Sequence, residues 1–285
     1  MNPLVGIVVL NFNGRDCLLS CLESLHHLRY QNFFVVVVDN ASSDDSFLLA
    51  QKSFPKYTYI SNHSNTGFAS GMNIGMKTVF ERGAVWAWLF NNDAHADEQA
   101  LNFLVACAEK RQQAGLLSPA IYTSGTRELW FGKGKVNFLR MRVLHVAPSE
   151  EELTQPSYSS EILTGCALLV SKTVFETVGP FDEQFFLYYE DADLSLRARE
   201  KGFETLVVPS AQVFHAEQSQ KNPQKLYYLV FSGLLFFKKY MLGWKKPYFL
   251  VYGTIRRIKN AVDIMRGRDA ALVVRRAYHD FYHEP

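Results

Sequence analysis

The sequence predicts an α/β fold with a mostly parallel central sheet flanked by helices. Residues 5–10 and 33–38 are two short runs of almost entirely apolar side chains. Continuous apolar runs of this length are typical of parallel strands that helices cover on both faces. Between them, Leu18, Leu22 and Leu25 recur with the spacing of one helical face. Polar residues follow each run, so we expect them at the carboxyl ends of the strands, where open α/β sheets bind ligands.

The remaining elements continue this alternation. Asp16 is placed to cap the first helix at its N-terminus. A short strand at 57–60 precedes a helix that opens at 65–75, and a strand at 85–90 precedes a helix from about 98 to 113. A further strand is predicted near 116–122. Polar segments follow the strands at 11–15, 39–45 and 91–97, and these form the candidate ligand-binding edge.

Length and composition restrict the class of protein. A chain of 285 residues and 32.6 kDa can bury one large core, with room for an appendage. A net charge of +2 argues against a dedicated nucleic-acid-binding protein. The four cysteines form no CxxC pair and are compatible with a reducing compartment. With no signal-peptide pattern at the N-terminus, we expect a cytoplasmic globular protein.

Residues 181–197 contain the densest group of candidate catalytic side chains. Glu190, Asp191 and Asp193 stand at the start of a predicted helix, and aromatic residues precede them closely. Acidic residues in a first helical turn are favoured by the helix dipole, so the cluster can simply stabilise a helix start. That explanation does not account for the aromatic residues. Aromatic surroundings raise the pKa of a carboxyl group by desolvation, which a general base working near neutral pH needs.

Two segments differ in composition from the rest of the chain. Residues 123–160 combine glycines, prolines, a basic run and three consecutive glutamates, which predicts loops or short strands. They would form either an acceptor-side flap or an ordinary surface insertion. Residues 226–237 form an apolar run that is too short to cross a bilayer as a helix. From 238 to 285, eleven Lys or Arg against four Asp or Glu give a net charge of +7.

This aromatic and basic tail has two interpretations. Aromatic anchors interleaved with basic residues suit the surface of an anionic membrane. A helical extension that packs on the rest of the protein and exposes a solvated basic face would have the same composition. The sequence favours the membrane interpretation only slightly.

Seven motifs, at 9–14, 38–42, 65–69, 91–93, 163–167, 179–183 and 189–194, occur in the order that a known family has them. Over residues 4–218, the chain resembles the inverting family 2 glycosyltransferases with a GT-A fold, and most closely their bacterial rhamnosyltransferase-like branch. The resemblance implies a catalytic domain at 1–218, with a nucleotide-sugar-binding half at 1–122 and an acceptor-side half at 123–218. Residues 219–285 would then be a helical C-terminal extension.

The resemblance also implies a donor site. Asp39 would accept the ring N–H of a pyrimidine base, although it can also cap the following turn. Asp93 and His215 would bind Mg²⁺ or Mn²⁺, which neutralises the departing diphosphate, although a lone histidine of this kind is as often structural. Many relatives have Asp-x-Asp where this chain has two asparagines before Asp93, so one acidic ligand is replaced by an amide. The implied donor set comprises Asn11, Phe12, Asn13, Asp39, Asn40, Gly67, Phe68, Asn92 and Asp93.

For the reaction, the resemblance implies one direct displacement that inverts the anomeric carbon. Asp191 would take the proton of the acceptor hydroxyl, while Glu190 and Asp193 would orient it or hold the helix start. Gly165, Tyr189 and Glu190 would lie on the acceptor side. The expected donor is dTDP-L-rhamnose, with UDP-sugars and furanose donors as alternatives. The expected acceptor is a glycan or polyprenyl-linked glycan, met at the inner face of the cell membrane.

Two other functional classes stay open. A sugar-phosphate nucleotidyltransferase also has an α/β nucleotide-binding domain, but residues 11–15 match its Gly-rich, basic phosphate loop poorly. A nucleotide-sugar-binding protein without transferase activity is the second class. The amides at 91 and 92 leave room for it, whereas Asp93 and Asp191 argue against it. Gly67, Gly71 and Gly75 are spaced for close helix packing and do not form a GxGxxG fingerprint, so no NAD-dependent enzyme is expected.

Overall fold

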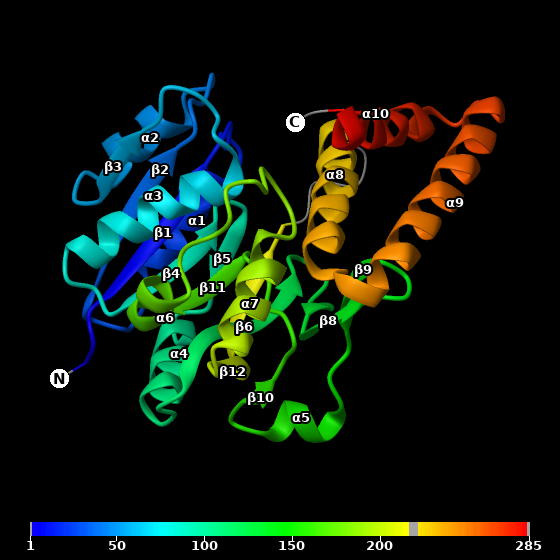
Figure 1. The fold of residues 1–285 in the computed structure, drawn as a ribbon. Helices are drawn as coiled ribbons and strands as arrows, with labels where there is room; N and C mark the ends of the chain where they lie inside the picture. Colours follow the sequence, from blue (N-terminus) through cyan, green and yellow to red (C-terminus); the bar gives the residue numbers. More distant parts are fainter. Residues whose placement is uncertain (1, 217–221, 284–285) are drawn as a thin grey trace.

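The computed structural model describes residues 2–216 and 222–283 and confirms the predicted α/β architecture (Figure 1). A 10-stranded sheet has the strand order β10-β12-β6-β11-β4-β1-β2-β3, to which β5 and β7 add beside β12 and β6. Strands β8 and β9 form a separate hairpin. The strands are β1 (Val5–Asn11), β2 (Phe33–Asp39), β3 (Thr58–Ser61), β4 (Trp86–Asn91), β5 (Ala94–Ala96), β6 (Ala114–Thr123), β7 (Leu129–Phe131), β8 (Lys133–Asn137), β9 (Arg142–Val146), β10 (Tyr158–Ser159), β11 (Ala167–Ser171) and β12 (Glu204–His215).

Helices flank the large sheet and continue past it at the C-terminus (Figure 1). Helices α1 to α7 lie between the strands in the sequence, and α8 to α10 follow the last strand. The helices are α1 (Leu18–His26), α2 (Ser46–Ser53), α3 (Gly67–Glu81), α4 (Ala100–Glu109), α5 (Glu150–Thr154), α6 (Lys172–Thr177), α7 (Glu190–Glu200), α8 (Pro223–Tyr240), α9 (Lys246–Met265) and α10 (Asp269–His283).

Most neighbours at the centre of the sheet run parallel, as the apolar runs predict. β4, β1, β2 and β3 are parallel to one another, and β12 is parallel to β6. The exception is β11, which runs antiparallel to both β4 and β6 and so joins the two parallel groups. The carboxyl ends of β1, β2 and β4 therefore lie at one edge, with the polar segments that follow them.

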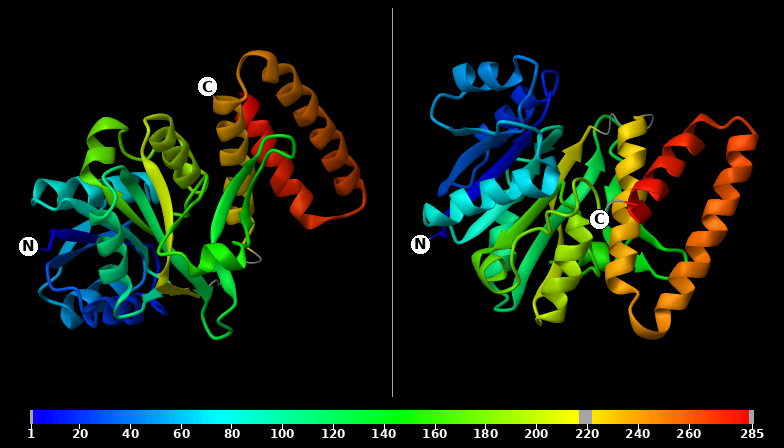
Figure 2. Two further views of the ribbon diagram at one scale, coloured as in Figure 1. Left: turned by 90° about the horizontal axis from the view of Figure 1, so that it is seen from below. Right: turned by 45° about the horizontal axis from the view of Figure 1, so that its top comes forward.

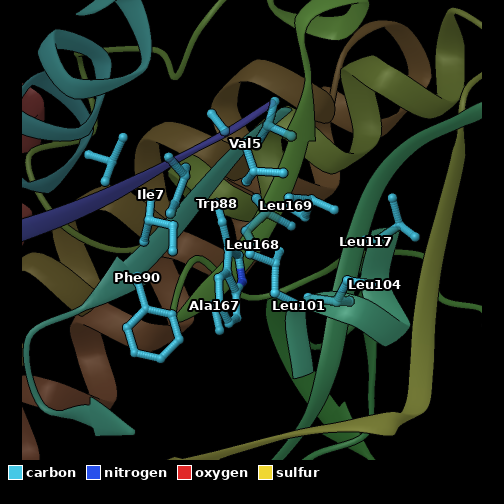
Figure 3. Packing of buried hydrophobic residues seen from close by; sticks show 14 of the residues in the cluster. Val5, Ile7, Trp88, Phe90, Leu101, Leu104, Leu117, Ala167, Leu168 and Leu169 are labelled. Carbon is cyan, nitrogen blue, oxygen red and sulfur yellow. The ribbon is translucent and has the colours of Figure 1, made fainter. Parts of the chain in front are cut away.

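Strand β1 shows how both faces of the sheet are covered. Successive side chains of a strand point to opposite faces. On one face α3 lies so close that a Cβ on Gly75 would be 2.1 Å from Cγ1 of Val8. On the other face Ile7 is fully buried, and Figure 3 shows it in the same apolar cluster as Trp88 and Leu101 of α4. The predicted role of the four-residue glycine spacing in close helix packing is confirmed at Gly75.

Two local predictions are wrong. The first helix begins at Leu18, with Cys17 in the capping position and no side-chain hydrogen bond to the cap, so Asp16 is not the N-cap. The backbone carbonyl of Gly14 accepts the N–H of Leu18 instead, at 2.8 Å. The helix expected over 98–113 ends at Glu109, because the chain turns there to enter β6 at Ala114.

The segment 123–160 contains short strands, as predicted. The β8–β9 hairpin is joined to the rest of the chain by β7 and by the short helix α5. Helix α5 begins with a capping box, in which Ser149 and Glu152 accept each other's backbone N–H groups. Residues 158–159 then return to the large sheet as β10, beside β12.

The C-terminal helices pack through a second apolar cluster. Phe236 and Phe237 of α8 are buried in it together with Ala192 of α7 and Phe185 of the preceding loop, and α9 and α10 contribute Phe249 and Phe281. Helix α8 is therefore packed against the start of α7, and Figure 2 shows α9 and α10 on its outer side. The predicted boundary between 218 and 219 lies outside the described residues, so the domain division stays a prediction. Among the described helices, none has the length and apolarity needed to cross a membrane.

Candidate active site

A pocket of about 350 Å³ opens where the end of β4, the start of α7, the end of β12 and the first turns of α8 meet. We call it the central pocket. The hairpin strand β9 contributes to its wall. Its lining combines three carboxyl groups, two imidazoles and one lysine with aromatic and apolar side chains, namely Phe68, Asn91, Asp93, Trp130, Val143, His145, Thr164, Gly165, Cys166, Leu187, Tyr188, Tyr189, Glu190, Asp191, His215, Lys225 and Leu229.

Asp191 lies in the first turn of α7 and faces the central pocket. Its Oδ2 accepts the backbone N–H of Gly165 at 2.8 Å, and its Oδ1 accepts that of Ala192 at 2.7 Å. Burial raises the pKa of Asp191, and the two N–H donors and the nearby His145 partly oppose that shift. A carboxylate held by two donors, with a raised pKa, is suited to accept a proton.

Glu190 lies beside Asp191 and is more deeply buried. Only 4% of its surface is exposed, and its Oε2 has no hydrogen-bond partner among the described residues. Burial, and then the charge of Asp191, raise its pKa well above the ordinary value. Ionising two neighbouring buried carboxyl groups costs free energy through repulsion, which further raises the pKa of Glu190 and favours its protonated form.

Asp193, grouped with these acids from the sequence, lies outside the central pocket. Its side chain is fully buried, where Oδ2 accepts Nε of Arg197 at 2.7 Å and Oδ1 pairs with Nζ of Lys239 at 2.6 Å. The hydroxyl of Tyr240 donates to the same Oδ1 at 2.9 Å. Its expected place beside the reacting groups is therefore corrected, because the helical turn directs this side chain towards α8 instead. Of its two predicted roles, the structure fits holding the start of α7.

The chain enters α7 through two strained residues. Tyr188 and Tyr189 are consecutive non-glycine residues with φ of 69° and 71°, which costs about 1–2 kcal/mol each. The ring of Tyr189 packs against those of Phe236 and Phe237 of α8, with centroids 5.3 and 6.2 Å away. Packing from the C-terminal helices thus offsets the strain that directs Glu190 and Asp191 into the central pocket.

Asp93 and His215, the predicted metal ligands, are brought together from distant parts of the chain. Nε2 of His215 lies 3.0 Å from Oδ1 of Asp93, and the ring of Trp130 lies 4.7 Å from the imidazole. Nδ1 of His215 and Oδ1 of Asn91 are buried and have no hydrogen-bond partner among the described residues. Within residues 2–216 and 222–283, no group of three or more His, Cys, Asp or Glu forms a complete metal cage.

These groups fit a metal site that the protein fills only in part. Asp93, His215 and Asn91 line the central pocket, and the amide oxygen of Asn91 is buried without a hydrogen-bond partner among the described residues. Mg²⁺ is commonly held by one or two carboxylates, with substrate phosphates and water as the other ligands. A donor diphosphate in the central pocket would supply the missing oxygen ligands.

Asp39 and Asn11, predicted for donor binding, form a buried polar network at the ends of β1 and β2. Nδ2 of Asn11 donates to Oδ1 of Asp39 at 2.8 Å, and Oδ2 of Asp39 accepts the backbone N–H of Ser42 at 2.9 Å. The capping role predicted for Asp39 is thus observed. Asn92 joins the network by donating from Nδ2 to Oδ1 of Asn11 at 3.0 Å. Neither Asn11, Asp39 nor Asn92 lines the central pocket.

Phe12 and Asn13 lie at the surface beside this network. Phe12 is 47% exposed, and Asn13 has a left-handed φ of 52°. Oδ1 of Asn13 accepts the backbone N–H of Ser43 at 2.8 Å, which ties the loop after β1 to the loop after β2. We refer to Phe12, Asn13 and Asp39, which lie at and just after the ends of β1 and β2, as the shelf; none of the three lines the central pocket.

Asn40, Gly67 and Phe68 connect this shelf to the central pocket. Nδ2 of Asn40 donates to the carbonyl of Gly67 at 2.8 Å. Gly67 has a φ of 85°, and a Cβ there would lie 2.5 Å from the carbonyl oxygen of Phe186. The N–H of Phe68 donates to that same oxygen at 2.7 Å. Among these three donor-site residues, Phe68 alone lines the central pocket.

Sequence reasoning missed three polar groups of the central pocket. Asn91 was noted only as a substituted acid, His145 lies in the 123–160 segment, and Lys225 lies in the tail. Nothing in the local sequence marks His145 or Lys225, because β9 and α8 reach the pocket only through tertiary folding.

Comparison with known proteins decides the family. Residues 2–227 match the protein family described as "Glycosyltransferase like family 2". The chain belongs to this family. A dTDP-rhamnosyl transferase, RfbF, of Shigella flexneri is 28% identical to this glycosyltransferase over 253 residues, covering 84% of this chain and 81% of the relative. An N-acetylglucosaminyl-diphospho-decaprenol L-rhamnosyltransferase of Mycobacterium tuberculosis is 25% identical over 248 residues, covering 78% and 80%.

Solved structures confirm the GT-A fold of this glycosyltransferase. The crystal structure of GalNAc-T7 with UDP, GalNAc and Mn²⁺ superposes with a TM-score of 0.71 at 17% identity and covers 90% of this chain. This chain spans about half of that protein, 51% of its length. The structure of S. aureus TarS 1-349 with UDP gives a TM-score of 0.58 at 14% identity, over 81% of this chain and 64% of that one.

Proposed function

We propose that this glycosyltransferase transfers L-rhamnose from dTDP-L-rhamnose to a glycan hydroxyl, with inversion and with the help of a divalent metal. The observation that carries the proposal is the central pocket, where the carboxylate of Asp191 and the Asp93–His215 pair line one cavity. Both relatives described above are named as rhamnosyltransferases, which supports the choice of sugar.

Asp191 is proposed as the general base. An acceptor hydroxyl placed beside it gives up its proton to a carboxylate oxygen and attacks the anomeric carbon from the face opposite the nucleotide. The bond from that carbon to the diphosphate oxygen breaks, and the diphosphate leaves with the electron pair, so the configuration inverts in one step. The N–H groups of Gly165 and Ala192 hold the carboxylate in place while its proton occupancy changes.

Asp93 and His215, with Oδ1 of Asn91, are proposed to hold Mg²⁺ or Mn²⁺. When bound, the metal would neutralise charge on the diphosphate as a Lewis acid. The presence of Mn²⁺ and UDP in the GalNAc-T7 structure supports the choice of cofactor. The side chain of Asp93 is 25% exposed, so a ligand in the central pocket can reach it.

The shelf formed by Phe12, Asn13 and Asp39 is proposed to hold the nucleotide base and ribose. Oδ2 of Asp39 accepts the backbone N–H of Ser42, and its remaining acceptor capacity would suit a ring N–H of a pyrimidine. The half-exposed ring of Phe12 offers an apolar surface beside that position. With the donor here, residues 1–122 form the donor half and 123–218 the acceptor half, as the sequence predicts.

A lipid-linked glycan is proposed as the acceptor, at the cytoplasmic face of the cell membrane. The mycobacterial relative is named for a diphospho-decaprenol acceptor, which supports a polyprenyl carrier. Gly165 and Tyr189, predicted on the acceptor side, both line the central pocket. The pocket's aromatic and apolar wall suits the sugar ring of such an acceptor.

One experiment tests the donor, the reaction and the metal together. The purified chain is incubated with dTDP-L-rhamnose or UDP-sugars, a synthetic polyprenyl-diphosphate-GlcNAc acceptor and Mg²⁺ or Mn²⁺, and the product's anomeric configuration is read by NMR. We expect transfer from dTDP-L-rhamnose with inversion, lost in excess EDTA and restored by metal. Full turnover in EDTA would refute the metal, retention would refute the single displacement, and donor binding without turnover would indicate a binding protein. Pyrophosphate consumption would indicate a nucleotidyltransferase.

A further inference from the structure

Helix α9 carries a largely exposed apolar face, which the β8–β9 hairpin contacts at Tyr248, whose hydroxyl donates to the carbonyl of Leu139. Its first helical members recur at intervals of three and four residues, Met265 follows seven residues after Ile258, and Trp244 stands in the short turn just before the helix. Trp244 is 85% exposed, Ile258 62% and Met265 78%. The face lies opposite Phe249, Gly253 and Asn260, which pack α9 against its neighbours. We define the α9 apolar face as Trp244, Tyr248, Val251, Ile255, Ile258 and Met265.

Helix α9 stands at the outer edge of the molecule. Figures 1 and 2 show it on the far side of α8 from the large sheet, with α10 crossing back to α8. The apolar residues of α8 are different, because Leu234, Phe236 and Phe237 are buried against the sheet region. Most of the exposed apolar side chains of the aromatic and basic tail therefore lie on or beside α9, whereas α8 exposes Leu229.

Basic side chains flank the α9 apolar face. By helical spacing Lys259 and Arg266 lie on one flank of this face, whereas Lys246 and Arg257 turn toward α8 and α10. The one acid within the helix, Asp263, is paired with Arg268 at 2.8 Å. An apolar stripe bordered by Lys and Arg, with a tryptophan at its end, is typical of helices that lie in a membrane interface.

A cleft of about 700 Å³ between α9 and α10 adds a second, independent observation. Arg257, Arg275, His279 and His283 line it, and its lining within the described residues contains no Asp or Glu. The guanidinium of Arg257 lies 5.1 Å above the ring of Tyr282. In the part of the chain that the structure describes, no ion pair joins Arg257 or Arg275 to a carboxylate. Two arginines without acidic partners in one cleft offer bidentate donors for an anion.

We propose that the α9–α10 hairpin docks on an anionic phospholipid surface, with the α9 apolar face in the lipid interface and a lipid phosphate in the Arg257–Arg275 cleft. A second copy of the chain is a poorer occupant, since an interface between two α9 helices would oppose the basic flanks Lys259 and Arg266 of each copy. The face extends over about 30 Å at 1.5 Å per residue, so it lies along the surface. This surface is separate from the central pocket, and lipid binding can be measured without donor or acceptor.

Vesicle binding by the full-length chain tests the proposal. Flotation is compared for vesicles of phosphatidylcholine alone and of phosphatidylcholine with phosphatidylglycerol, at low and high salt. We expect binding to the anionic vesicles that weakens with salt. Because each Lys or Arg near such a surface contributes about 1 kcal/mol, the double variant Arg257→Gln/Arg275→Gln should bind roughly 30-fold more weakly. Ile255→Gln/Ile258→Gln should also lose binding, through the apolar face.

Two matched variants control for charge and apolarity. Lys52→Gln/Lys56→Gln removes two exposed positive charges near α2, and Leu48→Gln/Leu153→Gln removes two exposed leucines from α2 and α5. Both should bind like the unchanged chain, and all variants should keep its melting temperature.

Several outcomes would overturn the proposal. These are equal binding to neutral vesicles, no vesicle binding at all, or an equal loss in the control variants. Binding of inorganic phosphate without vesicle binding would make the cleft a site for a soluble anion instead. A concentration-dependent dimer that the Ile255→Gln/Ile258→Gln variant abolishes would assign the face to a second copy.

Discussion

The two carboxyl groups at the start of α7 differ in their surroundings more than in their positions. Asp191 is held by two backbone donors, whereas Oε2 of Glu190 has no partner among the described residues. Burial raises the pKa of both groups, and the charge of Asp191 raises that of Glu190 further. We therefore assign the proton-accepting role to Asp191 and a proton-bearing, hydrogen-bonding role to Glu190.

Asp191→Asn should lower the rate of transfer by about 10²–10⁴-fold while leaving donor binding intact, because the amide keeps the shape but cannot accept the proton. Glu190→Gln should cost much less, because a protonated glutamate and a glutamine have nearly the same shape and polarity. Turnover and donor affinity of the two variants are compared. A dead Glu190→Gln beside an active Asp191→Asn would reverse the assignment.

The pH dependence of transfer should report the environment of Asp191. The base is inactive when protonated, so activity falls on acidification, and the raised pKa of Asp191 places that fall above the pH at which an ordinary aspartate titrates. The charge of His145 lowers this pKa, so removing it should raise the pKa. A pH profile of kcat/KM for His145→Gln should show the acidic limb displaced to higher pH. An unmoved limb, or one at lower pH, would show that another group titrates.

Among single residues, the sequence shows where some of the candidate groups stand but not their partners. Asp93 comes just after the predicted strand at 85–90 and Asp191 stands at the start of a predicted helix, so their meeting in one pocket could be expected. Asn91 and His145 could not be assigned in the same way. Their roles depend on an unsatisfied amide oxygen and on the placement of the β8–β9 hairpin, and neither leaves a local pattern.

Helix α8 holds the start of α7 in place through side-chain contacts. Asp193 holds Arg197 of its own helix and Lys239 of α8, and the hydroxyl of Ser232 in α8 donates to the carbonyl of Leu187 at 2.7 Å. These contacts hold both sides of the strained turn at Tyr188 and Tyr189. The orientation of the first turn of α7 therefore depends on the C-terminal helices.

Asp193→Asn should destabilise the protein by roughly 2 kcal/mol or more, because it leaves the largely buried Arg197 without its carboxylate, while Lys239 keeps only Asp182. The measurement is the melting temperature, with Asp263→Asn as the matched control. Asp263 pairs with the well-exposed Arg268, and such surface pairs contribute at most about 1 kcal/mol. Equal melting temperatures for the two variants would contradict the role assigned to Asp193.

Strands and helix ends differ in how well the sequence predicts them, for physical reasons. Strands with continuous apolar runs, such as β1 and β2, are predicted closely because burial on both faces leaves few alternatives. Helix ends are not, as Asp16 and the early end of α4 show, because the backbone of Gly14 and the turn into β6 decide them. The apolar run in α8 predicts burial, but the sequence does not say whether protein or lipid covers it.

For the whole molecule, the tail divides into a part that completes the core and a part that stands outside it. Phe236 and Phe237 of α8 share an apolar cluster with Phe185 and Ala192, and they pack against Tyr189 of the strained turn before α7. The exposed α9 apolar face makes no such contribution. We therefore expect a chain cut after residue 218 to lose part of its apolar core.

Truncation tests this division. A chain that ends at Asn222 loses α8 and uncovers Phe185, so it should melt well below the full chain and bind a hydrophobic dye. A chain that ends at Gly243 keeps α8 and should retain more of the stability and the transferase activity. Thermal melting and dye binding are measured for both. Equal stability of the shorter truncation and the full chain would show that the catalytic region folds without α8.

Helix α7 and strand β12 together set the spacing of two groups that line the central pocket. It begins just after α7, runs beside β6 for most of its length and ends at His215, so the proposed base and the proposed metal ligand sit at the two ends of one rigid helix–strand unit. The β8–β9 hairpin, which supplies His145, is attached to this unit from outside. We therefore expect substitutions in the hairpin to alter the wall of the central pocket at His145, while the spacing between Asp191 and His215, which α7 and β12 set, is kept.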